Sequence, residues 1–82
     1  MRVEAKFVFP ENPGVQGSGA YDVPDGAAVS DLLEAGRAVY GDRIPKNPED
    51  LLIFLRNGMP AQLGTRLSEG DRIHILRKIY GG

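Results

Sequence analysis

The sequence predicts an α+β fold in which one main helix packs on one face of a mixed sheet of four to five strands. Residues 2–9 and 72–79 alternate between polar and apolar side chains, as half-buried strands do. Between them, residues 29–40 repeat apolar side chains at helical spacing. The 82 residues, 41% of them hydrophobic, can build one core but not two. One helix and one sheet around that core are the expected layers.

The first two strands are predicted to form a hairpin. In residues 2–9 the side expected to face the core carries Val3, Ala5, Phe7 and Phe9. Two prolines and a glycine follow at 10–14 and predict a turn. Tyr21 and Val23 then resume an apolar alternation, which indicates the returning strand.

Residues 29–40 predict the main helix. Its apolar stripe consists of Val29, Leu32, Leu33, Gly36, Val39 and Tyr40. Asp31 lies in the first turn, where the helix dipole favours an acidic side chain, and Gly41 is placed to end the helix. A helical glycine costs about 1 kcal/mol relative to alanine. We therefore expect Gly36 to mark a close approach of the helix to the sheet.

A connection and a buried strand are expected after the helix. Residues 42–50 are mostly polar and include two prolines, which predicts a surface segment with only Ile44 turned inward. Residues 51–55 form an uninterrupted apolar run of strand length.

Two further strands complete the predicted sheet. Asn57-Gly58 predicts a tight hairpin, because both central residues of such a turn need a positive φ. Pro60 makes the returning strand short and peripheral. Residues 72–79 then supply the last strand.

The helix can cover only one face of this sheet, and the other face is expected to be open to solvent. The predicted alternation places four residues there: Leu52, Phe54, His74 and Leu76. Apolar side chains that gather on a solvated face indicate a docking surface.

Composition excludes several classes of site. The chain has no cysteine, which excludes disulfides, thiolate metal sites and thiol nucleophiles. His74 is the only histidine, and we expect no catalytic residue and no metal site. Ten basic residues against eleven acidic ones argue against nucleic-acid binding. No apolar run reaches the roughly 20 residues of a membrane span, and we expect a cytoplasmic protein that binds no membrane.

The terminal Gly81-Gly82 pair is the most distinctive local feature. Two residues without Cβ can thread a narrow channel and leave the terminal carbonyl accessible from either side. A free carboxylate is a poor acyl donor, so it must be activated, most simply as a mixed anhydride with AMP. The sequence shows no nucleotide site of its own, and we expect a partner to supply one.

The chain resembles the β-grasp sulfur carriers of the MoaD/ThiS family, which are relatives of ubiquitin. The resemblance covers nearly the whole chain and rests on the β-β-α-β-β order, Asn57-Gly58, the stretch 67–76 and the terminal Ile79-Tyr80-Gly81-Gly82. It implies a ubiquitin-like β-grasp domain over residues 1–78 and a flexible tail over 79–82. It also implies that Gly82 is adenylated and then converted to a thiocarboxylate.

The resemblance implies two protein partners and no cofactor bound to the carrier. One partner is a ubiquitin-activating-type adenylating enzyme that uses ATP. The other is a sulfur acceptor such as a molybdopterin synthase large subunit or a thiazole synthase. The implied contacts are the tail residues Ile79, Tyr80 and Gly81 and the partner-binding residues Phe54, His74, Leu76, Arg77 and Lys78.

Three alternatives stay open at the level of sequence. The length suits the molybdopterin branch, whereas the lack of prolines before Gly81 is closer to the thiamine or ubiquitin-like style. A ubiquitin-like modifier joined to lysines through Gly82 needs the same activation chemistry. A plain interaction module, in which the terminal glycines are incidental, is the third hypothesis.

Overall fold

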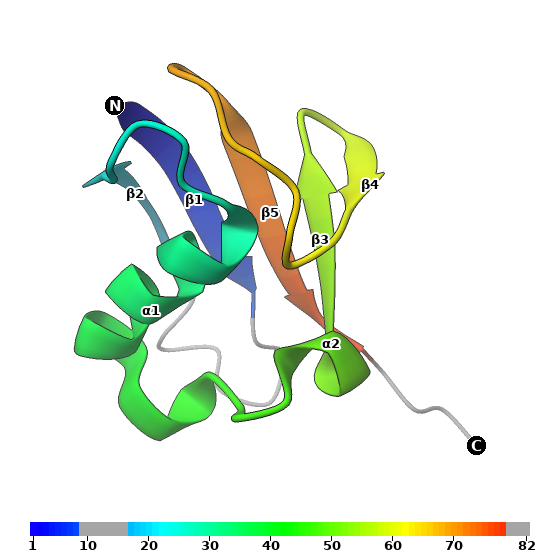
Figure 1. Ribbon diagram of the computed structural model, residues 1–82. Helices are drawn as coiled ribbons and strands as arrows, with labels where there is room; N and C mark the ends of the chain where they lie inside the picture. Colours follow the sequence, from blue (N-terminus) through cyan, green and yellow to red (C-terminus); the bar gives the residue numbers. More distant parts are fainter. Residues whose placement is uncertain (9–16, 79–82) are drawn as a thin grey trace.

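The computed structural model describes residues 1–8 and 17–78 and contains one mixed five-stranded sheet. The sheet order is β2-β1-β5-β3-β4, with β1 and β5 parallel and every other pair antiparallel. Helix α1 crosses one face of the sheet, as Figure 1 shows. This arrangement confirms the predicted α+β class. The elements are β1 (Arg2–Val8), β2 (Gly17–Asp22), α1 (Val29–Tyr40), a 3-10 turn (Gly41–Arg43), α2 (Pro48–Leu51), β3 (Leu52–Arg56), β4 (Met59–Ala61) and β5 (Arg72–Arg77).

Strands β1 and β2 form the predicted hairpin. Val3, Ala5 and Phe7 are fully buried, so the alternation identified the core side of β1 correctly. Val3 lies opposite Tyr21 in the β1–β2 register. The expected turn at 10–14 and the expected core position of Phe9 lie outside the described residues.

Helix α1 buries most of the predicted stripe against the sheet. Val29, Leu32, Leu33 and Gly36 are buried, but Val39 is 65% exposed. The expectation for Val39 was therefore wrong, because Val39 lies on the solvent side of α1, whereas Tyr40, the next residue, packs against Phe7 of β1 with ring centroids 4.7 Å apart. The Asp31 carboxylate accepts a hydrogen bond of 2.8 Å from Ala28 N at the start of the helix.

Gly36 marks a close approach of α1 to the sheet, as predicted. A Cβ added there would lie 2.7 Å from Phe7 Cζ and 3.1 Å from Ile44 Cδ1. Ile44 is only 2% exposed, so it turns inward as expected. The predicted surface connection at 42–50 is not wholly irregular, because the short helix α2 begins at Pro48. Leu51, which was expected to begin the next strand, is instead the last residue of α2.

The β3–β4 hairpin follows the sequence prediction. Asn57 and Gly58 have φ values of 52° and 82°, the left-handed backbone that this turn requires. The returning strand β4 has only three residues, includes Pro60 and lies at the edge of the sheet.

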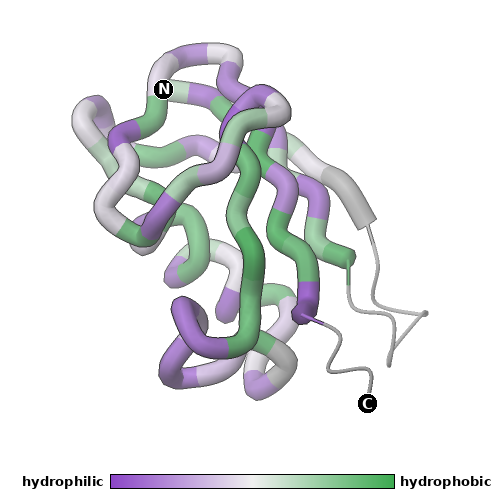
Figure 2. The backbone as a smooth tube through the Cα atoms, turned by 90° about the vertical axis from the view of Figure 1, so that its right-hand side faces the viewer, coloured by the Kyte–Doolittle hydropathy of each residue, from purple (hydrophilic) through white to green (hydrophobic). Residues whose placement is uncertain are grey.

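The face assigned to β3 requires a correction. Leu52 and Phe54 are 2% and 5% exposed and belong to the core beneath α1, not to the open face. Ile53, which is 43% exposed, lies on the opposite side of the strand. The run is apolar at every position from 52 to 55, so its pattern could not show which side is buried. In Figure 2 this strand is green along most of its length.

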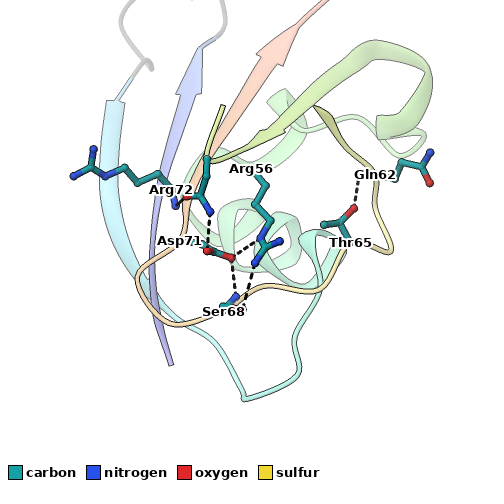
Figure 3. Close-up of polar contacts among 7 residues, drawn as sticks. Arg56, Gln62, Thr65, Ser68, Asp71 and Arg72 are labelled. Carbon is teal, nitrogen blue, oxygen red and sulfur yellow. Dashed lines mark hydrogen bonds and ion pairs between the residues drawn. The ribbon is translucent and has the colours of Figure 1, made fainter. Parts of the chain in front are cut away.

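A polar cluster fixes the end of the sheet where β5 begins. The Asp71 carboxylate accepts hydrogen bonds from Arg56 Nε at 2.7 Å, Asn57 Nδ2 at 2.9 Å and Ser68 N at 2.7 Å (Figure 3). Asn57 Oδ1 accepts a further bond from Arg72 N at 2.9 Å. The cluster joins the β3–β4 turn to the turn before β5 through a side chain that is only 6% exposed.

Candidate docking surface and carboxyl-terminal tail

The face of the sheet opposite α1 presents apolar side chains from adjacent strands. In the row nearest the end of β5, Val8, Leu76 and Ile53 lie side by side on β1, β5 and β3. Ile53 is exposed, and Val8 and Leu76 are half-buried. We refer to these three residues as the apolar row. They form a partly exposed hydrophobic strip on the open face, near the end of β5.

The next row along the strands is mixed in character. Lys6, His74 and Leu55 lie opposite one another on β1, β5 and β3. His74 and Leu55 are half-buried and Lys6 is exposed. The predicted open-face positions of His74 and Leu76 are therefore confirmed, whereas Phe54 is replaced there by its neighbours Ile53 and Leu55.

A third row contains paired charges. Arg72 lies beside Glu4, with Arg72 Nε 3.7 Å from Glu4 Oε2. Both side chains are mostly exposed, at 76% and 67%, so their ion pair contributes little to stability. The open face thus changes from apolar to charged along β5, from Leu76 back to Arg72.

The root of the tail is held against α2. Strand β5 ends at Arg77, and Lys78 N then donates a hydrogen bond of 2.9 Å to Leu51 O. Lys78 Nζ lies 3.5 Å from Glu49 O. Figure 1 places this end of β5 beside α2, at the end of the sheet away from the β3–β4 turn. The apolar row is therefore at the same end of the sheet as the exit of the chain.

The tail itself, Ile79, Tyr80, Gly81 and Gly82, lies outside the described residues. Arg77 and Lys78 are among the described residues, but Arg77 does not share the face of the sheet that carries His74 and Leu76. Arg77 lies opposite Leu52, whose side chain is in the core, so Arg77 is on the other side of β5 from Leu76. The structure thus brings His74 and Leu76 together and places Phe54 and Arg77 apart from them.

Sequence reasoning missed Ile53 as an exposed residue because residues 51–55 are apolar at every position and show no alternation. Arg56 is in phase with Leu52 and Phe54, although these two side chains are in the core. In the structure the Arg56 side chain is satisfied by Asp71 at the margin of the core. Only the pairing with β5, in which Ile73 and Ile75 are buried, identifies the core side of β3.

The described residues offer no sign of a metal centre or a membrane span. Across residues 1–8 and 17–78, no three His, Asp or Glu side chains are grouped to hold a metal ion. In the same part of the chain, no helix has the length and apolar character needed to cross a membrane.

One main helix on a mixed five-stranded sheet, with a parallel pair inside the sheet and an open opposite face, defines a ubiquitin-like β-grasp protein. Within that class the comparison with protein families is specific, since the ThiS family matches residues 14–82. The chain belongs to the ThiS family and is a small, non-catalytic carrier protein of the ThiS, MoaD and SAMP type. The match extends through the terminal Gly81-Gly82 pair.

Several solved structures share this fold. SAMP1 from Haloferax volcanii is 25% identical, with a TM-score of 0.79 and full coverage of both chains. The HVO 2177 protein of the same organism is 26% identical, with a TM-score of 0.77, and the match covers this whole chain and 87% of that one. A chain from the complex of subunits 1 and 2 of the Helicobacter pylori molybdopterin-converting factor is 20% identical, with a TM-score of 0.68 and full coverage of both. No curated protein sequence matches the chain significantly.

Proposed function

We propose that this protein is a sulfur carrier whose Gly82 carboxylate is adenylated by a partner enzyme and then converted to a thiocarboxylate. The single observation that supports this most directly is the ThiS-family match, which runs through the Gly81-Gly82 pair. The carrier supplies no catalytic group in this proposal. ATP is bound by the activating partner, a ubiquitin-activating-type enzyme, and the reaction takes place in the cytoplasm.

The proposed chemistry needs only an accessible chain end. The Gly82 carboxylate attacks the α-phosphorus of ATP, pyrophosphate leaves, and the product is an acyl adenylate. The terminal sulfur of a persulfide then attacks the acyl carbon, and AMP leaves. A thiol reduces the resulting acyl disulfide and releases the thiocarboxylate. The absence of Cβ at both terminal residues leaves the acyl carbon open to each nucleophile in turn.

The open face is the part of the folded domain that holds the partner in this proposal. The apolar row lies at the same end of the sheet as Lys78, so a protein bound there is also next to the root of the tail. Ile53 is the most exposed member of that row. Buried apolar anchors of this kind usually contribute most of the binding energy of an interface.

The experiment that tests the function is intact-mass measurement. The purified protein is incubated with the adenylating enzyme of the same organism, ATP and a persulfide donor. We expect a mass gain equal to the exchange of one oxygen for sulfur, dependent on ATP. A variant with one alanine added after Gly82 is the matched control and should not change in mass. An unmodified wild-type chain in the presence of an enzyme that hydrolyses ATP to AMP would contradict the proposal.

The recipient of the sulfur is the finer part of the proposal. We place the chain first in the molybdopterin branch, with a synthase large subunit as acceptor, because its 82 residues suit that branch better than the shorter thiamine carriers. A thiazole synthase is the acceptor in the thiamine branch. Sulfur transfer from the thiocarboxylate to one purified acceptor and not to the other distinguishes the two.

A ubiquitin-like modifier is the second candidate, because the chain is similar over its whole length to SAMP1, one of the small archaeal modifier proteins. The same acyl adenylate would then be attacked by a lysine of another protein. Conjugates of higher mass in cells, lost when Gly82 is deleted, would favour this function. A plain interaction module instead predicts that an added residue after Gly82 changes nothing.

A further inference from the structure

Two hollows flank β5 on the open face, away from the apolar row. One of about 250 Å³ lies over β2, β1 and β5, and its walls include Glu4, Lys6, Arg72 and His74. The short side chain of Ala20, opposite Glu4 on β2, leaves this hollow unfilled. The second, of about 450 Å³, lies on the other side of the same two β5 residues, next to the turns at 57–58 and 70. Arg72 and His74 therefore form a wall shared by both.

The first hollow is predominantly basic. Lys6, Arg72 and His74 line it against a single carboxylate, Glu4. Within residues 1–8 and 17–78, Lys6 has no acidic group within ion-pair distance. Glu4 engages Arg72 at 3.7 Å, too long and too exposed to neutralise it strongly. A cation is thus left available beside a space large enough for a side chain.

The charge of the rest of the surface makes this hollow distinctive. The helical segment 25–51, on the other layer of the molecule, holds six acidic residues and three basic ones. The stretch 72–82 holds three basic residues and no acidic one. Arg77 lies on the other side of β5, so the positive site on the open face consists of Arg72 together with Lys6, on a chain whose net charge is -1. Such segregation orients an incoming partner of complementary charge.

We propose that the hollow between Lys6 and Arg72 receives an acidic side chain of the protein that docks on the apolar row. This inference rests on the proposed function and adds the chemistry of the partner: an apolar contact at Ile53 and Leu76, and an aspartate or glutamate displaced from it along β5. Arg72 and His74, which line the hollow, precede Leu76 on β5 by four and two residues. The acidic contact in the hollow and the apolar contact at Leu76 are therefore about 10 Å apart.

Binding measurements with the adenylating enzyme of the same organism test the charge and the space separately. Lys6→Glu reverses the charge, and Ala20→Leu fills the hollow without changing charge. We expect Lys6→Glu to raise Kd about five- to tenfold at low salt and less at high salt. We expect Ala20→Leu to raise Kd by a similar factor at both salt concentrations. Lys46→Glu, the same change on the exposed connection, should bind like the wild-type chain.

A peptide titration keeps the inference independent of the proposed function. The ¹⁵N-labelled protein is titrated with acetyl-Leu-Asp-Glu-Leu-Asp-Glu and, in parallel, with acetyl-Leu-Lys-Lys-Leu-Lys-Lys. We expect the acidic peptide to shift the amides of residues 4–6, 20 and 72–74, and the Lys6→Glu variant to lose these shifts. Equal shifts with both peptides, or shifts that persist in Lys6→Glu, would overturn the inference. If the intact-mass experiment failed but the acidic peptide shifted these amides as expected, the proposed function would be overturned and this inference would stand.

Discussion

Asp71 is a buried carboxylate that joins the β3–β4 turn to the turn before β5. Burial by itself raises its pKa, but the hydrogen bonds donated by Arg56, Asn57 and the backbone of Ser68 outweigh burial, and the pKa lies below its ordinary value of 3.8. Because the pKa is lower in the folded state, the ionised group stabilises the fold above the unfolded-state pKa. That contribution is lost as the pH falls through the folded-state pKa.

We therefore expect Asp71→Asn to lower the free energy of unfolding by about 1–3 kcal/mol at pH 7. The deficit relative to the wild-type chain should shrink as the pH falls from the unfolded-state pKa of 3.8 through the lower folded-state pKa, because the wild-type carboxylate takes up a proton over that range. Urea denaturation at pH 7, 4 and 3 measures this directly. Asp42→Asn, an exposed carboxylate, should leave stability nearly unchanged throughout. A deficit that stays constant with pH would mean that the charge of Asp71 does not contribute.

Ile53 and Phe54 are neighbours in sequence with opposite environments. We expect Ile53→Glu to leave the fold intact and to raise the Kd for the activating enzyme at least about tenfold, because it removes the most exposed side chain of the apolar row. Phe54→Glu should instead destabilise the fold by about 4 kcal/mol or more, because it buries a charge in the core. Circular dichroism with thermal melting, followed by calorimetric titration, separates the two effects. Val39→Glu, an exposed apolar residue on α1, is the control and should affect neither measurement.

At the scale of elements, the contact between α1 and the sheet depends on the missing side chain at Gly36. Alanine there would gain about 1 kcal/mol in helix propensity. Its Cβ would, however, lie 2.7 Å from Phe7 Cζ, and Phe7 is fully buried and cannot move aside freely. Overpacking of this kind costs typically about 1–3 kcal/mol, so we expect Gly36→Ala to be destabilising overall.

Chemical denaturation compared with Gly64→Ala checks this expectation. A Cβ at Gly64 would meet nothing within 4 Å, so that variant should be neutral or slightly stabilising. If Gly36→Ala were as stable as the wild-type chain, α1 could shift away from β1 at little cost, and the close approach would not define the layer spacing.

The elements that could be predicted from sequence are those whose pattern has a clear period. Strand β1 and helix α1 each bury one side, so charged residues on the other side reveal the repeat. Strand β3 is apolar at four consecutive positions, and its only charged residue, Arg56, is accommodated by a partner fifteen positions away. Its orientation depends on pairing with β5, which no local pattern encodes.

The short helix α2 could not be predicted for a related reason. A single turn of helix is too short to show a stripe, and isolated segments of that length are not stable without tertiary contacts. Here Pro48 is buried and Lys78 N bonds to Leu51 O, so α2 is tied to the chain where it leaves β5. The same contact places the root of the tail beside the apolar row, which the sequence alone did not reveal.

At the scale of the whole molecule, the proposed function divides binding from chemistry. The folded domain provides the open face, and the residues after Lys78 provide the reacting carboxylate. Each can therefore be changed without the other. A variant with one alanine after Gly82 keeps the open face and should bind the activating enzyme with a Kd within about threefold of the wild-type value. It should nevertheless form no thiocarboxylate, because its terminal carboxylate is displaced by one residue from the position that the ATP site accepts.

Ile53→Glu should show the opposite behaviour. At saturating carrier concentration we expect a rate of adenylation close to that of the wild-type chain, with KM raised at least about tenfold, because uniform binding is lost while the tail is intact. Pyrophosphate release measured over a range of carrier concentrations gives both parameters, and Val39→Glu serves as the matched control. If Ile53→Glu lowered the maximal rate and left KM unchanged, the open face would take part in the chemical step itself. The folded domain would then do more than hold the partner beside the tail, and the division between domain and tail would be wrong.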